Sequence, residues 1–87
     1  MPPSTAQTAE IVQAARRGDL EAFAALVEAT QSMAYAVAWQ VLRQEPDARD
    51  VVQEAYIVAF RRLAELAEPD AFAGWLRRIV VGLSLSH

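Results

Sequence analysis

The sequence predicts an all-α fold, a compact bundle of four to five helices formed by one domain over residues 1–87. The chain is 54% hydrophobic and 22% charged over its 87 residues, which is enough for one core and too apolar for a disordered segment. It has only three glycines and four prolines, and most of them stand where a helix would begin or end. Alanine is abundant, and no segment alternates polar and apolar residues as a strand would.

The first helix is expected over about residues 5–17, after a flexible tail of residues 1–4. Ser4 and Gln7 have the spacing of a capping box, in which each side chain bonds the backbone N–H of the other residue. This pair therefore marks the start of the helix.

A second helix follows almost without a linker. Gly18 followed by Asp19 is typical of a helix end that passes directly to the N-cap of the next helix. The second helix starts near Leu20, and the sequence leaves open whether it kinks or breaks around Thr30. Residues 33–43 have apolar side chains on two sides at about 100° per residue, so we expect this segment at the centre of the bundle.

A third helix is predicted from Pro46 to about Leu66, because proline is well tolerated in a first turn. One face is apolar and is expected to pack inward: Ala48, Val52, Ala55, Tyr56, Ala59, Leu63 and Leu66. The opposite face is expected in solvent, within about 100° of arc, and carries Asp50, Gln53, Glu54, Ile57 and Arg61.

A last helix is predicted after Pro69 and Asp70. Its apolar stripe consists of Phe72, Trp75, Leu76, Ile79 and Leu83. Large aromatic side chains contribute most to a small core, so we expect Trp39, Phe60 and Trp75 to be largely buried.

Composition excludes several classes of protein. The chain has no cysteine and its single histidine is His87, which excludes disulfide scaffolds and thiolate sites and argues against a histidine-dependent active site. The longest apolar run, residues 33–39, is far shorter than the roughly 20 residues that span a bilayer, and no signal region precedes it. We therefore expect a cytoplasmic protein without membrane contact.

The charge of the chain limits how it binds nucleic acid. The formal net charge is −3, whereas a protein that binds duplex DNA mainly by neutralising phosphates is basic. All eight cations are arginines, which suit planar and stacking contacts. Any contact with nucleic acid must therefore be local.

Three sequence motifs follow one another along the chain. They are Gly18-Asp19-Leu20-Glu21-Ala22-Phe23, then Asp47-Ala48-Arg49-Asp50-Val51-Val52-Gln53-Glu54-Ala55-Tyr56, then Phe72-Ala73-Gly74-Trp75-Leu76-Arg77-Arg78-Ile79. Their order and spacing resemble region 2 of the bacterial RNA polymerase sigma factors, and the short segment before them resembles the extracytoplasmic-function group. The resemblance implies a sigma region 2-like helical domain that binds the clamp helices of the largest polymerase subunit. It also implies that the domain helps to recognise and melt the −10 promoter element.

The resemblance implies polymerase binding by Asp50, Gln53, Glu54 and Ile57. Carboxylates and an amide can engage arginines of a partner around a small apolar centre. The alternative is an ordinary solvated helix face, on which such residues are common.

The resemblance further implies contacts with unpaired promoter bases by Arg61, Phe72, Trp75, Arg77 and Arg78. Aromatic rings and guanidinium planes stack on extruded bases. In the family the loop before the last helix, here residues 67–71, shapes the base pocket, although its two acids argue against phosphate contact. For Phe72 and Trp75 the alternative is core packing, which their apolar stripe favours.

The chain departs from the family at several positions. Val81 and Gly82 stand where an arginine and an asparagine are usual, and Val58 stands where a basic residue is common. We expect the family's C-terminal DNA-reading domain to be absent from this chain. The departures favour an alternative, a sigma-like interaction module or decoy that binds polymerase or an anti-sigma factor without opening promoters.

An enzyme is the least favoured class, and neither a metal nor a cofactor is expected. Asp47, Asp50 and Glu54 have a helical spacing that a metal site can use, but they face outward and lack inward histidines. The expected partners are the RNA polymerase core, the non-template single strand of promoter DNA, and an anti-sigma factor.

Overall fold

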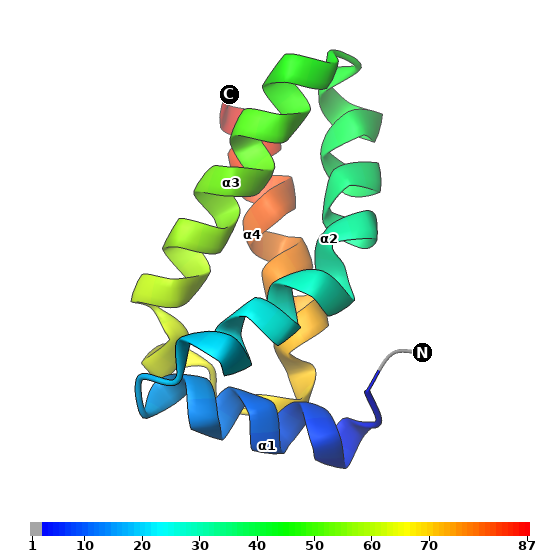
Figure 1. The fold of residues 1–87 in the computed structure, drawn as a ribbon. Coiled ribbons are helices and arrows are strands. Elements are labelled where there is room, and N and C mark those ends of the chain that lie inside the picture. The colour runs from blue at the N-terminus through cyan, green and yellow to red at the C-terminus, as the bar shows by residue number, and fades with distance from the viewer. Residues whose placement is uncertain (1–2) are drawn as a thin grey trace.

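The computed structural model describes residues 3–87, which form four α-helices and two short 3₁₀-helices (Figure 1). In chain order the elements are α1 (Thr5–Arg16), α2 (Leu20–Leu42), α3 (Glu45–Arg61), η1 (Leu63–Glu65), η2 (Pro69–Ala71) and α4 (Phe72–Ser86). The all-α prediction is confirmed. No helix within the described residues is long and apolar enough to cross a membrane.

The predicted capping box starts α1. The Ser4 hydroxyl accepts a hydrogen bond from the Gln7 N–H at 3.2 Å, and the Gln7 side chain accepts one from the Ser4 N–H at 2.8 Å. These bonds satisfy two N–H groups that a helix start leaves without partners. Residues 1 and 2 of the expected tail lie outside the described part of the chain.

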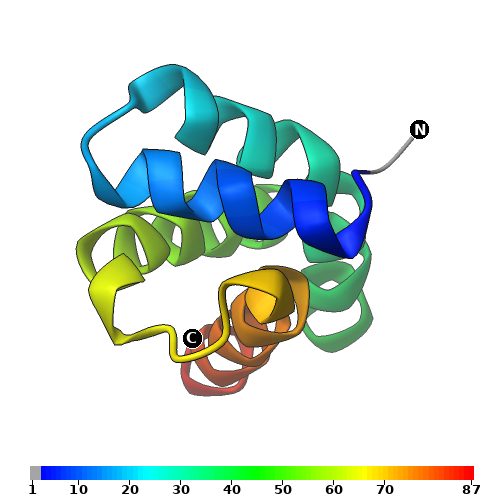
Figure 2. The same ribbon diagram turned by 90° about the horizontal axis from the view of Figure 1, so that it is seen from below.

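A tight turn joins α1 to α2. Gly18 lies at φ +97°, in the left-handed region that glycine adopts without steric cost. Asp19 is the N-cap of α2, and its carboxylate accepts a hydrogen bond from the Ala22 N–H at 3.1 Å. The turn brings α1 and the first half of α2 side by side (Figure 2).

One continuous helix of 23 residues, α2, changes direction about midway (Figure 1). The hydroxyl of the buried Thr30 donates to the Leu26 carbonyl at 2.7 Å, a back-bond of the kind that bends helices. On the other side, the Tyr56 hydroxyl of α3 lies 2.7 Å from Thr30 Oγ1. The segment is therefore kinked without a break, which decides between the two alternatives.

The second half of α2 packs with α3 and α4, and α1 crosses one end of this group and contacts η2 (Figures 1 and 2). Most of the core consists of small and branched side chains: Val12, Ala15, Leu26, Ala34, Val37, Ala38, Ala48, Val51, Val52, Ala55, Ala59, Leu63, Leu66, Leu76 and Val80. Phe72 is the one aromatic side chain that is fully buried among the described residues.

The prediction that the third helix reaches Leu66 is wrong. α3 ends at Arg61, and the chain turns through η1 beside the C-terminal end of α1. Leu63 and Leu66 are still buried. The Leu63 carbonyl accepts one 3₁₀ hydrogen bond, from the Leu66 N–H at 3.2 Å. The Arg16 guanidinium of α1 donates to the carbonyls of both residues, to Leu63 at 3.2 Å and to Leu66.

The prediction that Trp39 and Phe60 are largely buried is also wrong, because their side chains are 45% and 46% exposed. The alanine-rich core lets the helices approach closely, which leaves little space for large rings between them. Phe60 instead packs edge-to-face on Phe23 at the rim, with ring centroids 5.1 Å apart. Trp75 is half-buried, which partly agrees with expectation.

Candidate functional site

The outward face of α3 carries a compact set of exposed side chains. Asp50, Gln53, Glu54 and Ile57 are all exposed, and 51% of the Ile57 surface is accessible. Residues spaced by three, four and seven share one side of a helix. The structure therefore brings these four residues together, and we call them the α3 surface.

The two carboxylates of the α3 surface are free within residues 3–87. Neither Asp50 nor Glu54 takes part in an ion pair or a side-chain hydrogen bond there. The other acids of the helix are engaged, in the contacts Glu45–Arg49 at 2.5 Å and Asp47–His87 at 3.4 Å. A cationic partner would meet Asp50 and Glu54 without first displacing an internal partner.

Phe60 enlarges the apolar part of this region. It lies three residues after Ile57, about 60° around the helix, and its ring is almost half exposed. Sequence reasoning assigned Phe60 to the core and so missed it as a surface residue. The signal was present in the helical spacing, which places Phe60 nearer to Ile57 than to the buried face.

Arg61 lies apart from the other DNA-binding candidates. It lines a shallow pocket of about 360 Å³ between α1, the end of α3 and η1. The other lining residues are Ala15, Arg16, Gly18, Phe60, Leu63 and Ala64. None of them belongs to α4, so the structure does not join Arg61 to Arg77 and Arg78.

The exposed side of α4 is weakly basic. Arg77 and Arg78 are exposed, form no ion pair within residues 3–87, and share a helix that contains no acidic residue. Phe72 is fully buried, which is the packing role that its apolar stripe favoured, and its ring cannot reach a base from there. Trp75 is half-buried, with its ring centroid 6.0 Å from that of Phe72.

The loop before α4 is anchored at both ends by buried side chains, Leu66 and Phe72. Between them η2 packs against α1, while the carboxylates of Glu68 and Asp70 are exposed. The exposed acids would repel phosphates. This loop is therefore better suited to contact a base than the backbone of a DNA strand.

No three histidine, cysteine or acidic side chains lie close enough to hold a metal ion in the part of the chain from residue 3 onward. The polar side chains of the α3 surface, and Arg77 and Arg78 of α4, are open to solvent. Their chemistry is that of recognition, by ion pairs, hydrogen bonds and stacking.

Comparison with known proteins relates this chain to one family. A family model described as Sigma-70 region 2 matches residues 26–87. The chain is 39% identical over 79 residues to the ECF RNA polymerase sigma-E factor of Escherichia coli K12, covering 88% of this chain and 40% of that protein. It is 33% identical over 81 residues to the RNA polymerase sigma-H factor of Pseudomonas aeruginosa, covering 93% and 42%.

A further relative is the probable RNA polymerase sigma factor RfaY of Xanthomonas campestris, 36% identical over 70 residues, which are 80% of this chain and 18% of that protein. This chain thus spans less than half the length of each of these relatives. No solved structure matches it significantly.

Proposed function

The chain belongs to the sigma-70 region 2 family, and from this premise we propose that it acts in transcription initiation as a partner of RNA polymerase. Its role is binding rather than catalysis, and it acts in the cytoplasm, where polymerase is. Two surfaces divide the work. The α3 surface binds the polymerase core, and the exposed side of α4 contacts promoter DNA.

Polymerase binding rests on one observation, the pair of unengaged carboxylates around an exposed apolar side chain. Asp50 and Glu54 are free to accept bidentate hydrogen bonds from arginines of the clamp helices. Gln53 adds an amide, and Ile57 supplies the apolar centre that protein interfaces bury. Since none of these side chains packs in the core, a partner can bind them without unfolding the domain.

The test is a calorimetric titration of an isolated clamp-helix fragment into the wild-type domain and its variants. We expect Gln53→Ala and Glu54→Ala each to weaken binding by about 1 to 3 kcal/mol, as for central polar groups of an interface. Glu21→Ala is the matched control, because Glu21 is an exposed acid of α2 outside the α3 surface. Equal affinities for all four proteins would contradict the assignment of the α3 surface.

For promoter DNA we propose that Arg77, Arg78 and the exposed part of Trp75 hold the unpaired non-template strand of the −10 element. Stacking on an indole or a guanidinium plane requires unpaired bases. Because the net charge is −3, binding to duplex should be weak and only slightly salt-dependent. Of the five candidates, Phe72 is fully buried and Arg61 lines a pocket that includes no residue of α4, so we assign them no base contact.

Fluorescence anisotropy with matched single-stranded and duplex oligonucleotides tests this role. We expect the single strand to bind better, and Arg78→Gln to lower that binding more than Arg17→Gln, which removes an equal charge from the end of α1. A preference for duplex, or equal losses in the two variants, would overturn the assignment of α4.

A decoy remains the second candidate, and a specific feature of α4 favours it. The position after Arg78 on the same side is Gly82, which is exposed, and Val81 is half-buried, so only two cations serve DNA. On the α3 surface, by contrast, all four residues that we assign to polymerase binding are present and exposed. Polymerase binding without any single-strand preference would identify a module that occupies polymerase, or an anti-sigma factor, without opening promoters.

A further inference from the structure

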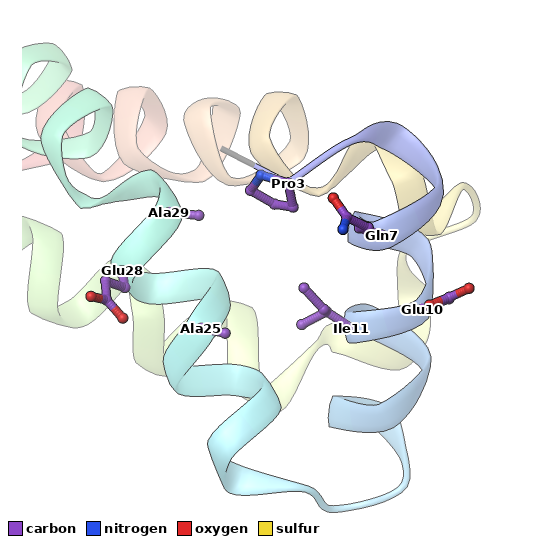
Figure 3. Close-up of a pocket in the computed structure, with 7 residues that line it drawn as sticks. All are labelled: Pro3, Gln7, Glu10, Ile11, Ala25, Glu28 and Ala29. Carbon is purple, nitrogen blue, oxygen red and sulfur yellow. The ribbon is translucent and has the colours of Figure 1, made fainter. Parts of the chain in front are cut away.

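A groove runs between α1 and the first half of α2 (Figure 3), with a volume of about 950 Å³. That volume is at the upper end of the range for binding sites, roughly 300 to 1,000 Å³. Its lining residues are Pro3, Gln7, Glu10, Ile11, Ala25, Glu28 and Ala29. None belongs to α3 or α4, so the groove is separate from both surfaces described above.

The floor of the groove is apolar. Ile11 points into it from α1, while Ala25 and Ala29 face it from α2 (Figure 3). The two alanines are one helical turn apart and both are exposed. Their small side chains leave a trough parallel to α2, into which a row of apolar side chains from another helix can fit.

The two shoulders of the groove are acidic. Glu10 stands on the outer side of α1 and Glu28 on the outer side of α2 (Figure 3). Neither carboxylate has an ion pair or hydrogen bond within residues 3–87. In this part of the chain no arginine pairs with either carboxylate: α2 contains no arginine or lysine, and Arg16 of α1 is engaged with the carbonyls of Leu63 and Leu66.

We propose that this groove docks a basic amphipathic helix of a partner protein. The apolar stripe of that helix would lie on Ile11, Ala25 and Ala29. Arginines or lysines flanking the stripe on both sides would reach Glu10 on one shoulder and Glu28 on the other. A third helix laid on two neighbouring helices is the common helix-in-groove mode of recognition.

Charge selects this occupant over the alternatives. A second copy of the chain would bring a net charge of −3 to an acidic groove, and a nucleic acid would bring phosphates. An acidic or purely apolar helix would leave both carboxylates unpaired at the edge of the contact. Because α3 takes no part in the groove, the partner can bind while the α3 surface is occupied.

The probe is a synthetic amphipathic helix of about 18 residues, five turns, with leucines on one stripe and arginines on both flanks. Its counterpart carries glutamates in place of the arginines. Each labelled peptide is titrated into the 87-residue protein by fluorescence anisotropy, and amide shifts locate the bound peptide. We expect only the basic peptide to bind, with the largest shifts at Ile11, Ala25 and Ala29.

Matched variants test the two parts of the groove separately. Glu10→Gln combined with Glu28→Gln should weaken binding of the basic peptide about five- to tenfold, since an exposed ion pair contributes a few-fold. Glu21→Gln, an exposed acid of α2 outside the lining, should change it less than twofold. Ala25→Arg should block the groove, whereas Ala24→Arg adds the same charge to a neighbouring exposed position outside the lining.

Several results would overturn the proposal. One is binding of the acidic peptide as tight as that of the basic one, and another is equal effects of Ala25→Arg and Ala24→Arg. Failure of the basic peptide to bind at millimolar concentration, or shifts confined to α3, would do the same. The proposal would also be overturned if sedimentation showed that the protein forms a dimer and that Ala25→Arg dissociates it, because a second copy of the chain would then fill the groove.

Discussion

Replacing Arg16 tests how the chain between α3 and α4 is held. The guanidinium is partly buried and donates to the carbonyls of Leu63 and Leu66, which lie beyond the end of α3. A hydrogen bond from a charged donor contributes about 1.5 to 3 kcal/mol. The two bonds share one half-exposed group, so we expect Arg16→Met to lower the free energy of unfolding by about 2 to 3 kcal/mol.

Arg17→Met is the matched control, because Arg17 is the exposed neighbour and should change stability by less than about 0.5 kcal/mol. Urea unfolding followed by circular dichroism measures both variants. For a domain of this size, 1 kcal/mol corresponds to a shift in Tm of about 4 to 8 °C, so thermal melts provide a second readout. Equal losses in the two variants would refute the idea that Arg16 anchors η1.

Four other substitutions test the packing. Tyr56→Phe should cost about 1 kcal/mol at neutral pH by removing the hydroxyl contact with Thr30. Burial raises the pKa of Tyr56 above its ordinary value near 10, and the bond with Thr30 partly opposes this. The wild type should therefore lose stability as the pH rises above about 10, and Tyr56→Phe should lose less. Urea unfolding at several pH values measures both. Phe72→Ala should cost about 3 to 5 kcal/mol because the ring is fully buried. Trp75→Ala should cost about 2 kcal/mol, because Trp75 is half-buried. Similar losses of stability in thermal melts of the two variants would contradict their different burial. Ser84→Ala should stabilise by about 1 kcal/mol, because the Ser84 hydroxyl is buried without a hydrogen-bond partner, and a lower Tm would show that the hydroxyl finds one in solution.

The helix starts were readable from the sequence because local bonds determine them. The capping box at Ser4 and the Gly18-Asp19 turn depend on residues within three positions of each other. Most of the buried stripe of α3 followed from helical period alone. In α4 only Phe72 and Leu76 of the predicted stripe are buried, together with Val80 and Ser84, which were not predicted. The exposure of the α3 surface followed in the same way, as the side opposite the buried stripe.

The remaining features depend on contacts between residues far apart in the chain. The end of α3 involves Arg16, which is 47 residues away from Leu63, and helical period predicts no such partner. The kink of α2 likewise involves Tyr56 of α3. Trp39 and Phe60 were misassigned because residue type was given more weight than helical position, and the alanine-rich core has little room for large rings.

The candidate DNA site shows the same limit. Residue type grouped Arg61 and Phe72 with the arginines of α4, but one lines a pocket beside α1 and the other fills the core. Only Arg77, Arg78 and part of Trp75 stay accessible together on α4. Such a distinction requires knowing which face of α4 packs on its neighbours.

Site-specific photocrosslinking tests the central claim, that the α3 surface binds polymerase, most directly. A benzophenone amino acid replaces Ile57 in one protein and Ala24 in another, and each protein is irradiated with the RNA polymerase core. Both positions are exposed, but only the first lies on the α3 surface. Crosslinking of the largest subunit from position 57 and not from position 24 is the predicted result. No crosslink from position 57, or an equal one from position 24, would contradict it.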